Sequence, residues 1–218
     1  MSQKKKKSIL EAPKILIDLP NITEPEYVLQ SEDVFTAGVI RDCVIDHQTA
    51  RKVTFDKIKF INVTFTHSSL NELELTDVIF ENCDCSNLEI IDSSIHRTEF
   101  RNCKLIGTDF SGATLRNVGF YNCLSDYANF RFANFKQVVF QESSLIQADY
   151  YEAVFQKVFL HSCNINQAQF TGTKLEGMDL SECDFAGLGV GTKELQGCVI
   201  AKEQAYIFAG LFGLVLKE

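Results

Sequence analysis

The chain has 218 residues, of which 29 are acidic and 21 are basic, and its formal net charge is −8. This length suits one domain with a sizeable core, and no apolar run is long enough to cross a membrane. The acidic balance disfavours direct binding of nucleic acid. The sequence therefore predicts a soluble, cytoplasmic protein with no membrane or nucleic-acid partner.

Residues 1–14 are basic, because they contain Lys4 to Lys7 and Lys14 against Glu11 alone. No apolar stretch with a cleavage site follows the lysine run, so a secretory signal is not expected. Such runs usually form solvated tails, and a partner-binding arm is the alternative. We predict a flexible tail over residues 1–14, followed by an opening strand from Ile15 to Leu19 that covers the first turn of the fold.

From Phe35 to Ile200, almost every fifth residue is large and apolar, as in Phe100, Leu105, Phe110, Leu115 and Phe120. Neither a helix with period 3.6 nor a flat strand with period 2 keeps such a series on one face. The backbone must instead turn a corner every five residues. This repeat predicts a square coil whose fifth side chains all point to one central axis.

A second period of twenty residues sets the size of the coil. Four sides of five residues then make one rung, and each rung pairs with the rungs above and below it. Proline would delete a donor from this ladder, and no proline follows Pro25. We predict an all-β coil over residues 15–200. Six of the eight cysteines follow the longer period, namely Cys43, Cys83, Cys103, Cys123, Cys163 and Cys183.

The cysteine column has two interpretations. On adjacent rungs the thiols could converge as metal ligands or as disulfides. However, the same column also accepts Val63 and Ser143, which suggests that the position needs only a compact side chain. We favour the structural interpretation and predict no metal ion and no cofactor.

Residues 201–218 lose the five-residue phase and predict a cap on the end of the coil. Lys202 to Phe212 is typical of a short α-helix, and Leu214 to Leu216 of a last strand. A solenoid end needs a cap, but this one has more apolar surface than one rung can cover. We predict a two-fold dimer through the cap, with a monomeric lid as the alternative. The predicted interface residues are Tyr206, Phe208, Leu211 and Phe212.

The negative charge is concentrated in the coil. Without residues 1–14, 28 acidic and 16 basic residues remain. In the twenty-residue register, two adjoining sides hold ten acidic and four basic residues, whereas the side centred on Ile95 and Leu115 is close to neutral. We call the ten acidic residues the acidic edge: Asp46, Glu72, Asp84, Glu89, Asp92, Asp109, Asp126, Asp149, Glu152 and Asp184.

The acidic edge also has two interpretations. It could simply keep the rod soluble. Alternatively, rows of carboxylates on a stiff rod resemble double-stranded DNA to a basic groove, because DNA-binding proteins gain much of their affinity from neutralising phosphates. The acidic edge is therefore a candidate surface for binding a protein partner that normally binds DNA.

Candidate catalytic residues are few. His47 and His67 are twenty residues apart and should stack on an outer face, but we expect no Asp or Cys to complete a site around them. The glycine-rich segment from Gly187 to Gly191 lacks the strand-to-helix setting of a phosphate loop and should loosen the last turn before the cap. We predict that the protein is not an enzyme.

Several five-residue units match the A-(D/N)-(L/F)-x-x signature of pentapeptide repeat proteins. They are Ala128-Asn129-Phe130, Ala133-Asn134-Phe135, Ala148-Asp149-Tyr150, Thr108-Asp109-Phe110 and Cys183-Asp184-Phe185. This resemblance covers roughly residues 33–200. It implies a right-handed quadrilateral β-helix.

Within that superfamily the chain resembles the Qnr quinolone-resistance proteins. The resemblance rests on the length, on Tyr127-Ala128-Asn129-Phe130 followed by Val138-Val139-Phe140, and on the ending from Leu195-Gln196-Gly197 through Gln204-Ala205 to Leu211-Phe212-Gly213. It implies a homodimer, joined through C-terminal helices, that binds DNA gyrase and topoisomerase IV and protects them from quinolones in part by imitating DNA.

The chain departs from the well-known plasmid-borne Qnr proteins in one respect. Those members carry loops that project from the coil, whereas the five-residue phase runs unbroken here. No loop residue is therefore transferred from them. The alternative function is that of a pentapeptide-repeat scaffold or immunity protein with a different protein partner.

Overall fold

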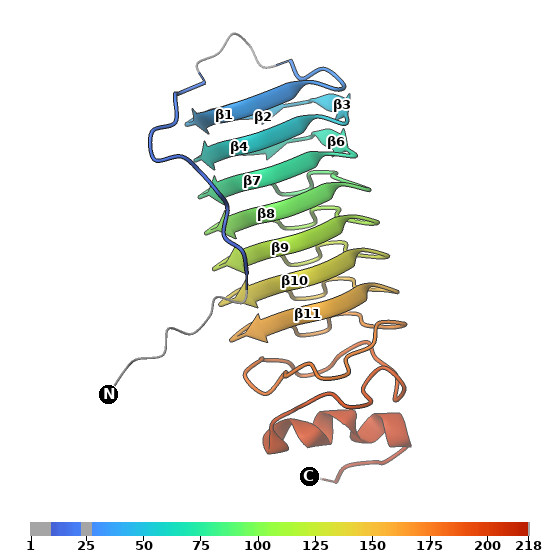
Figure 1. Cartoon of the computed structure of the whole chain (residues 1–218). Helices are drawn as coiled ribbons and strands as arrows, with labels where there is room; N and C mark the ends of the chain where they lie inside the picture. The colour runs from blue at the N-terminus through green and yellow to red at the C-terminus, as the bar shows by residue number, and fades with distance from the viewer. Residues whose placement is uncertain (1–9, 23–27, 218) are drawn as a thin grey trace, which may run out of the picture.

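The computed structural model describes residues 10–22 and 28–217 as one elongated coil with a helix at its C-terminal end (Figure 1). Seven long strands stack into one parallel sheet in the order β1-β4-β7-β8-β9-β10-β11, while β2 pairs with β5 and β3 with β6. The elements are β1 (Val34–Arg41), β2 (Val44–Asp46), β3 (Thr49–Arg51), β4 (Thr54–Ile61), β5 (Thr64–Thr66), β6 (Ser69–Asn71), β7 (Glu74–Glu81), β8 (Ser94–Arg101), β9 (Thr114–Tyr121), β10 (Asn134–Gln141), β11 (Val154–His161) and the helix η1 (Lys202–Phe212).

The twenty-residue rung is confirmed by the pairing of the strands. Phe60 is the partner of Phe80, and Phe100 that of Phe120, so residues twenty apart lie one above the other. The same register continues as single bridges to Asn164 and Asp184, without an insertion between rungs. The coil is right-handed (Figure 1). Among the described residues, no helix has the length and apolar character that a membrane crossing needs.

Left-handed backbone conformations form the corners of the coil. They recur at intervals of five residues, for example with φ of 66° at Gly107 and 54° at Asn117. Asn117 bends β9 in the middle, so one long strand covers two sides of the rod. Other corners are closed by a hydrogen bond across the turn, such as that from the Ala113 N–H to the Phe110 carbonyl, 3.0 Å. Glycine and asparagine suit these corners because they tolerate positive φ.

Aromatic rings fill the interior as stacked columns. Phe120 lies between Phe100 and Phe140, with ring centroids 5.0 and 4.5 Å away and nearly parallel planes. In a second column, Tyr150 lies between Phe130 and Phe170 at 5.1 Å on each side. Rings at this spacing fill the rung repeat of about 4.8 Å, so each rung packs onto the next without a gap.

The cysteine column is part of this core. Cys83, Cys103 and Cys123 are buried on successive rungs, and all eight cysteines of the chain are free thiols. The Cys123 Sγ donates a hydrogen bond to the Phe100 carbonyl at 3.4 Å. Burial raises the pKa of the Cys183 thiol to about 12, so this thiol stays protonated at neutral pH. These observations support the structural interpretation of the column.

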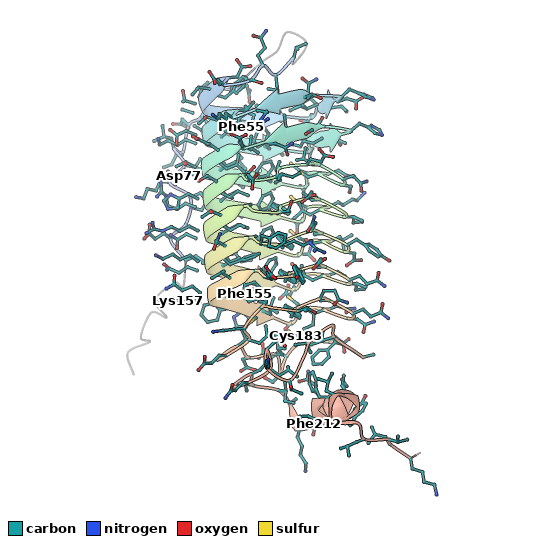
Figure 2. The ribbon with its side chains drawn as sticks, turned by 90° about the vertical axis from the view of Figure 1, so that its right-hand side faces the viewer. Phe55, Asp77, Phe155, Lys157, Cys183 and Phe212 are labelled. Carbon is teal, nitrogen blue, oxygen red and sulfur yellow. The ribbon has the colours of Figure 1, made fainter. Side chains whose placement is uncertain are left out.

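The cap consists of η1 packed on the last rungs of the coil. The helix has the predicted bounds, but its turns are of the tighter 3₁₀ type rather than α. The Phe208 ring lies 5.9 Å from that of Phe185, and the Gln204 Nε2 donates to the carbonyls of Leu180 and Cys183. The predicted last strand is wrong, since residues 214–217 are described and pair with no strand. η1 thus acts as a lid over the core, while the chain beyond it extends away from the coil (Figure 2).

The N-terminal prediction is also wrong in part. Residues 10–22, which we call the strap, run along the outside of the stacked long strands instead of covering the first rung (Figure 1). The Glu11 N–H donates to Asn117 Oδ1 at 3.3 Å and the Lys14 N–H to Asp77 Oδ1 at 2.9 Å, while the Pro20 carbonyl accepts from Val39 N–H at 2.8 Å. Residues 10–14 are therefore attached to the rod. The predicted tail otherwise falls on residues 1–9, outside the described residues.

Asp77 links the strap to the rod. It is 3% exposed and accepts two hydrogen bonds from the Arg97 guanidinium, at 2.6 and 2.8 Å, besides the one from Lys14 (Figure 2 shows Asp77 on the flank). Burial alone would raise the pKa of Asp77, but the hydrogen bonds from Arg97 and Lys14 outweigh burial and lower the pKa. The folded protein is therefore stabilised by the ionised form of this carboxyl.

We expect Asp77→Asn to lower the free energy of unfolding by about 3 kcal/mol at pH 7, because Arg97 loses its buried partner. A carboxyl whose pKa is lowered in the folded state contributes stability above its unfolded pKa of about 3.9 and loses it as the pH falls through the folded value. The difference between wild type and variant should therefore shrink as the pH falls from 5 towards 2. Unfolding by guanidinium chloride at several pH values measures this difference in the free energy of unfolding.

Asp56→Asn is the control for this experiment, since Asp56 pairs with Lys57 at 2.8 Å on the surface and should contribute less than about 1 kcal/mol. A penalty for Asp77→Asn that stays the same from pH 7 to pH 2 would contradict the role given to its charge.

We expect Tyr150→Phe to stabilise the protein by about 1 to 2 kcal/mol. The Tyr150 hydroxyl is buried and has no hydrogen-bond partner among the described residues, and leaving such a group unsatisfied is costly. Its column neighbours Phe130 and Phe170 show that a phenyl ring fits the position. Thermal or chemical unfolding measures the gain. Tyr151→Phe, on the neighbouring outward-facing residue, should change little, and a loss of stability for Tyr150→Phe would show that the hydroxyl has a partner.

Candidate partner-binding surface

The acidic edge forms rows along the rod because its residues occupy stacked positions. Glu89 is the bridge partner of Asp109, Asp109 of Asn129, and Asn129 of Asp149, so these side chains lie on four successive rungs of one side. Successive rungs are about 4.8 Å apart. The register therefore brings together carboxylates that are twenty or more residues apart in the sequence.

All ten residues of the acidic edge reach the surface. Five are exposed and five are half-buried. The exposed ones are Asp46, Glu89, Asp92, Glu152 and Asp184, and the half-buried ones are Glu72, Asp84, Asp109, Asp126 and Asp149.

Local hydrogen bonds orient several of these carboxylates. Asp109 Oδ1 accepts from the Ser111 N–H and Asp149 Oδ1 from the Tyr151 N–H, each at 2.8 Å. Asp84 accepts from both the hydroxyl and the N–H of Ser86. Burial tends to raise the pKa of Asp84, but the bonds from Ser86 outweigh burial and lower the pKa. The hydrogen bonds thus hold these side chains in place, and they favour the charged form of Asp84.

Four members of the acidic edge have a cationic or histidine neighbour. Glu72 binds Arg51, Asp84 lies 3.5 Å from Lys104, Asp149 lies 3.1 Å from Arg131, and Asp46 contacts two histidines. Within residues 10–22 and 28–217, no salt bridge joins the other six to a basic residue: Glu89, Asp92, Asp109, Asp126, Glu152 and Asp184. Most of the negative charge of the edge is therefore uncompensated.

The strap lies on the opposite side of the rod. Its partners Asp77 and Asn117 are corner residues with positive φ. His67 and Gly107, ten residues earlier, are also corner residues, and their corner lies between the two sides that carry the acidic edge. Ten residues are two of the four sides, so these corners are diagonally opposite. The strap leaves the acidic edge open to solvent.

An aromatic cluster on the acidic edge was missed by sequence reasoning. Tyr127 and Phe132 are corner residues that are 58% and 50% exposed. The Arg131 guanidinium lies 4.6 Å from the ring centroid of Tyr151 and 5.7 Å from that of Phe132, and it also pairs with Asp149. The signal was present, since both Tyr127 and Phe132 fall two places after the inward position of the five-residue unit, where a large aromatic ring must face water.

Positive φ is unfavourable for a bulky residue such as Phe132, whose φ is 60°. The positions above and below it in the same column hold Gly112 and Glu152. An exposed ring at a strained corner is a candidate for contact with a partner.

The predicted dimer interface divides into two parts. Phe208 is 8% exposed and packs inside the chain against Phe185, so it belongs to the lid and has little surface left for a second chain. Tyr206 and Phe212 are 64% and 69% exposed, and Leu211 is also exposed. The extended residues that follow, Leu214, Val215 and Leu216, add further exposed apolar surface at the same end of the rod.

His47 and His67 stack as predicted, with ring centroids 4.9 Å apart and planes at 16°. The expectation that no acidic residue joins them is wrong. Asp46 contacts both, with its Oδ2 2.7 Å from His47 Nδ1 and its Oδ1 3.5 Å from His67 Nδ1. Sequence reasoning missed this because it compared only residues twenty apart, whereas Asp46 precedes His47 directly at the end of β2.

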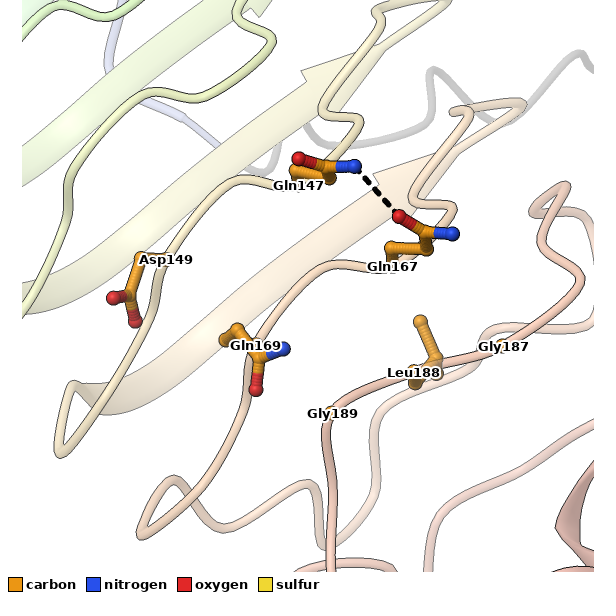
Figure 3. Close-up of a pocket in the computed structure, with 7 residues that line it drawn as sticks. All are labelled: Gln147, Asp149, Gln167, Gln169, Gly187, Leu188 and Gly189. Carbon is orange, nitrogen blue, oxygen red and sulfur yellow. Dashed lines mark hydrogen bonds between the residues drawn. The ribbon is translucent and has the colours of Figure 1, made fainter.

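A shallow groove of about 590 Å³ lies where the acidic edge meets the last rung (Figure 3). It is lined by a ladder of glutamines, in which the Gln147 Nε2 donates to Gln167 Oε1 at 2.6 Å, and by Gly187 and Gly189. Gly189 adds no side chain to the groove, and a Cβ there would lie 1.8 Å from Gln169 Oε1, so Gln169 would have to rotate to admit one. Its lining offers one charged group, Asp149, and no set of groups that would activate a substrate.

Comparison with known proteins agrees with the repeat and the coil. The model of the pentapeptide repeat region matches residues 53–130 and 93–170, and the model of eight pentapeptide repeats matches residues 163–188. The first model alone covers more than half of the chain. Comparison with curated proteins gave no match.

Similar solved structures include a trypsin-treated variant of QnrB1, a plasmid-mediated fluoroquinolone resistance protein, with 20% identity and a TM-score of 0.40 over 83% of this chain and 99% of that one. HetL, a pentapeptide repeat protein involved in heterocyst differentiation regulation in the cyanobacterium Nostoc, has 15% identity and a TM-score of 0.37 over 79% of this chain and 91% of that one.

The repeating units, the four-sided coil and the family models agree, and the chain belongs to the pentapeptide repeat family.

Proposed function

We propose that this protein binds type II topoisomerases, DNA gyrase and topoisomerase IV, by imitating DNA, and that it protects them from quinolones without catalysis of its own. The observation that carries the proposal is the acidic edge, rows of carboxylates along a stiff rod of which six have no salt bridge among the described residues. It would occupy the basic groove through which the topoisomerase binds double-stranded DNA.

The spacing of the charges favours this type of partner. Each DNA strand carries one phosphate per about 3.4 Å of helix axis, and the rod can carry one carboxylate per rung, about 4.8 Å along its own axis. Lysine and arginine side chains are long and flexible enough to take up this difference. Glu89 and Asp109, adjacent on one side of the rod, both lack a salt bridge to a basic residue among the described residues.

The aromatic cluster adds to the fit. Tyr127, Phe132 and Tyr151 lie among the carboxylates, and aromatic rings attract cationic side chains through their faces. A partner groove rich in lysine and arginine would meet both kinds of group on the same edge. This combination distinguishes the edge from a surface that only keeps a protein soluble.

The choice of topoisomerases among basic partners rests on the resemblance to the Qnr proteins. This resemblance rests on residues in the segment from Tyr127 to Phe140 and in the ending from Leu195 to Gly213. Within this segment Tyr127 is exposed next to Asp126 of the acidic edge, whereas Ala128, Phe130 and Val138 to Phe140 are buried in the core.

We further propose a homodimer through the exposed cap residues Tyr206, Leu211 and Phe212. A two-fold axis at this end would place the same apolar surface of each chain against the other. Two rods joined end to end would present two acidic edges, one to each half of a two-fold symmetric topoisomerase.

Purified gyrase treated with ciprofloxacin tests the function directly. Adding the protein should lower the amount of drug-trapped cleaved DNA, or inhibit supercoiling, in a dose-dependent way. Triple charge reversal of Glu89, Asp92 and Glu152 to Lys should reduce this effect at least tenfold, since each change adds repulsion in the basic groove.

The matched control is the reversal of Glu74, Glu142 and Glu176 to Lys, which makes the same change of charge at exposed residues outside the acidic edge. This control should keep the activity of wild type. Equal loss in both triple variants would remove the mimicry mechanism. If neither cleavage nor supercoiling changes at any dose of wild type, the partner is another protein and a scaffold or immunity role takes its place.

Light scattering coupled to gel filtration tests the dimer. The chain has a mass of 24.6 kDa. Wild type should have twice this mass, as a dimer, whereas the double variant Tyr206→Asp and Phe212→Asp should have the mass of a single chain. Phe132→Asp, an exposed aromatic residue far from the cap, is the control and should leave the dimer intact. A wild type that stays monomeric at high concentration would mean that the cap is only a lid.

A further inference from the structure

We propose that Asp46, His47 and His67 form a surface site for a divalent transition metal, with Zn²⁺ as the best match. The site does not depend on the proposed topoisomerase function. It lies at the N-terminal end of the rod, away from η1, so it is also independent of the proposed dimer (Figure 1).

The coil places the two histidines side by side. Strand β2 pairs with β5, with Asp46 opposite Thr66, so the residues that follow each strand are in register. His47 and His67 both have positive φ, 50° and 46°, and occupy the corner of successive rungs. A rigid ladder thus sets the backbone positions from which the two imidazoles project before any metal binds.

The ligand atoms are already close together. One atom from each of Asp46, His47 and His67 lies within 4.8 Å of the others. Around a tetrahedral zinc ion with bonds of about 2.0 to 2.2 Å, neighbouring ligand atoms are about 3.3 Å apart. The Asp46 carboxylate is already 2.7 and 3.5 Å from the two Nδ1 atoms. The His47 and His67 side chains are 73% and 75% exposed, so they can rotate to close the remaining difference.

The donor set selects the class of metal. Two imidazole nitrogens and one carboxylate oxygen suit Zn²⁺ and its neighbours Co²⁺, Ni²⁺ and Cu²⁺, whereas Mg²⁺ and Ca²⁺ prefer oxygen ligands alone. Three protein ligands leave a fourth position of a tetrahedral ion open to water or to a side chain from a partner.

A bound ion would join the first two rungs. Asp46 is tied to the start of the coil through Gln48, whose Nε2 donates to the Asp46 carbonyl at 2.7 Å and whose Oε1 accepts from the Leu29 N–H at 2.8 Å. Leu29 is buried against the end of the core. Metal binding should therefore stabilise the N-terminal end of the rod, where the stack of rungs begins.

Isothermal titration of untagged, full-length protein with Zn²⁺ alone tests the site. Wild type should bind one zinc ion per chain, and thermal unfolding should shift to higher temperature with Zn²⁺ but not with Mg²⁺. Co²⁺ in place of zinc should give the visible absorption of a nitrogen- and oxygen-ligated ion. His47→Asn and His67→Asn should each lower the affinity for zinc at least tenfold.

Asparagine is the matched replacement, because Asn87 occupies the next rung of the same column with φ of 56°. His161→Asn is the control, since among the described residues the one salt bridge of His161 is with Glu182, at 3.6 Å, and no second histidine stacks on it; this variant should bind zinc as wild type does. If a histidine variant fails to fold, Asp46→Asn replaces it, with the same tenfold loss expected. Absence of binding by wild type, or equal affinity in wild type and all these variants, would overturn the proposal.

Discussion

Parallel pairing between residues twenty apart is the constraint on which the rest of the structure depends. Because Phe100 must lie on Phe120, and Phe120 on Phe140, every position of the rung becomes a column along the rod. A column either fills the core, turns a corner or faces water, and this environment determines which side chains fit at each of its positions. This explains why the interior accepts stacked rings and why compact thiols, Val63 and Ser143 can replace one another within a single column.

The same constraint turns a dispersed sequence pattern into a surface. Glu89, Asp109 and Asp149 are far apart in the chain, yet they share one side of the rod and differ only in rung. Left-handed corners project side chains outward, so Phe132 and the stacked His47 and His67 are displayed to solvent. The strap occupies the diagonally opposite corner through Asp77 and Asn117, which leaves the acidic edge free.

How far the sequence could predict this structure depends on the periodicity. The rung size, the core columns and the bounds of η1 could be predicted, because a repeat reports the environment of each position many times. The path of the strap could not be predicted, because residues 10–22 are not part of a repeat. Their backbone N–H groups bond to Asp77 and Asn117, and backbone hydrogen bonds leave no pattern in the sequence. Leu214 to Leu216 suggested a strand by composition, but no neighbouring strand edge pairs with these described residues.

The candidate sites show the same limit. The acidic edge could be predicted from the twenty-residue register. Its exposure could be predicted as well, because its residues occupy outward-facing positions of the five-residue unit. The contact of Asp46 with both histidines depends on side-chain rotation around a corner, and the Arg131 cluster depends on side chains from adjacent rungs. Column positions predict which residues are neighbours, but they do not predict which atoms meet.

A crystal structure tests the stacking most directly, through the distances between Cα atoms of residues twenty apart. Successive rungs require Glu89 to Asp109, and likewise Cys83 to Cys103 and Cys103 to Cys123, to be separated by about 4.8 Å along a common axis. Any other repeat length in this part of the chain, or cysteines scattered around the rod, would contradict the stacking and remove the acidic edge along with it.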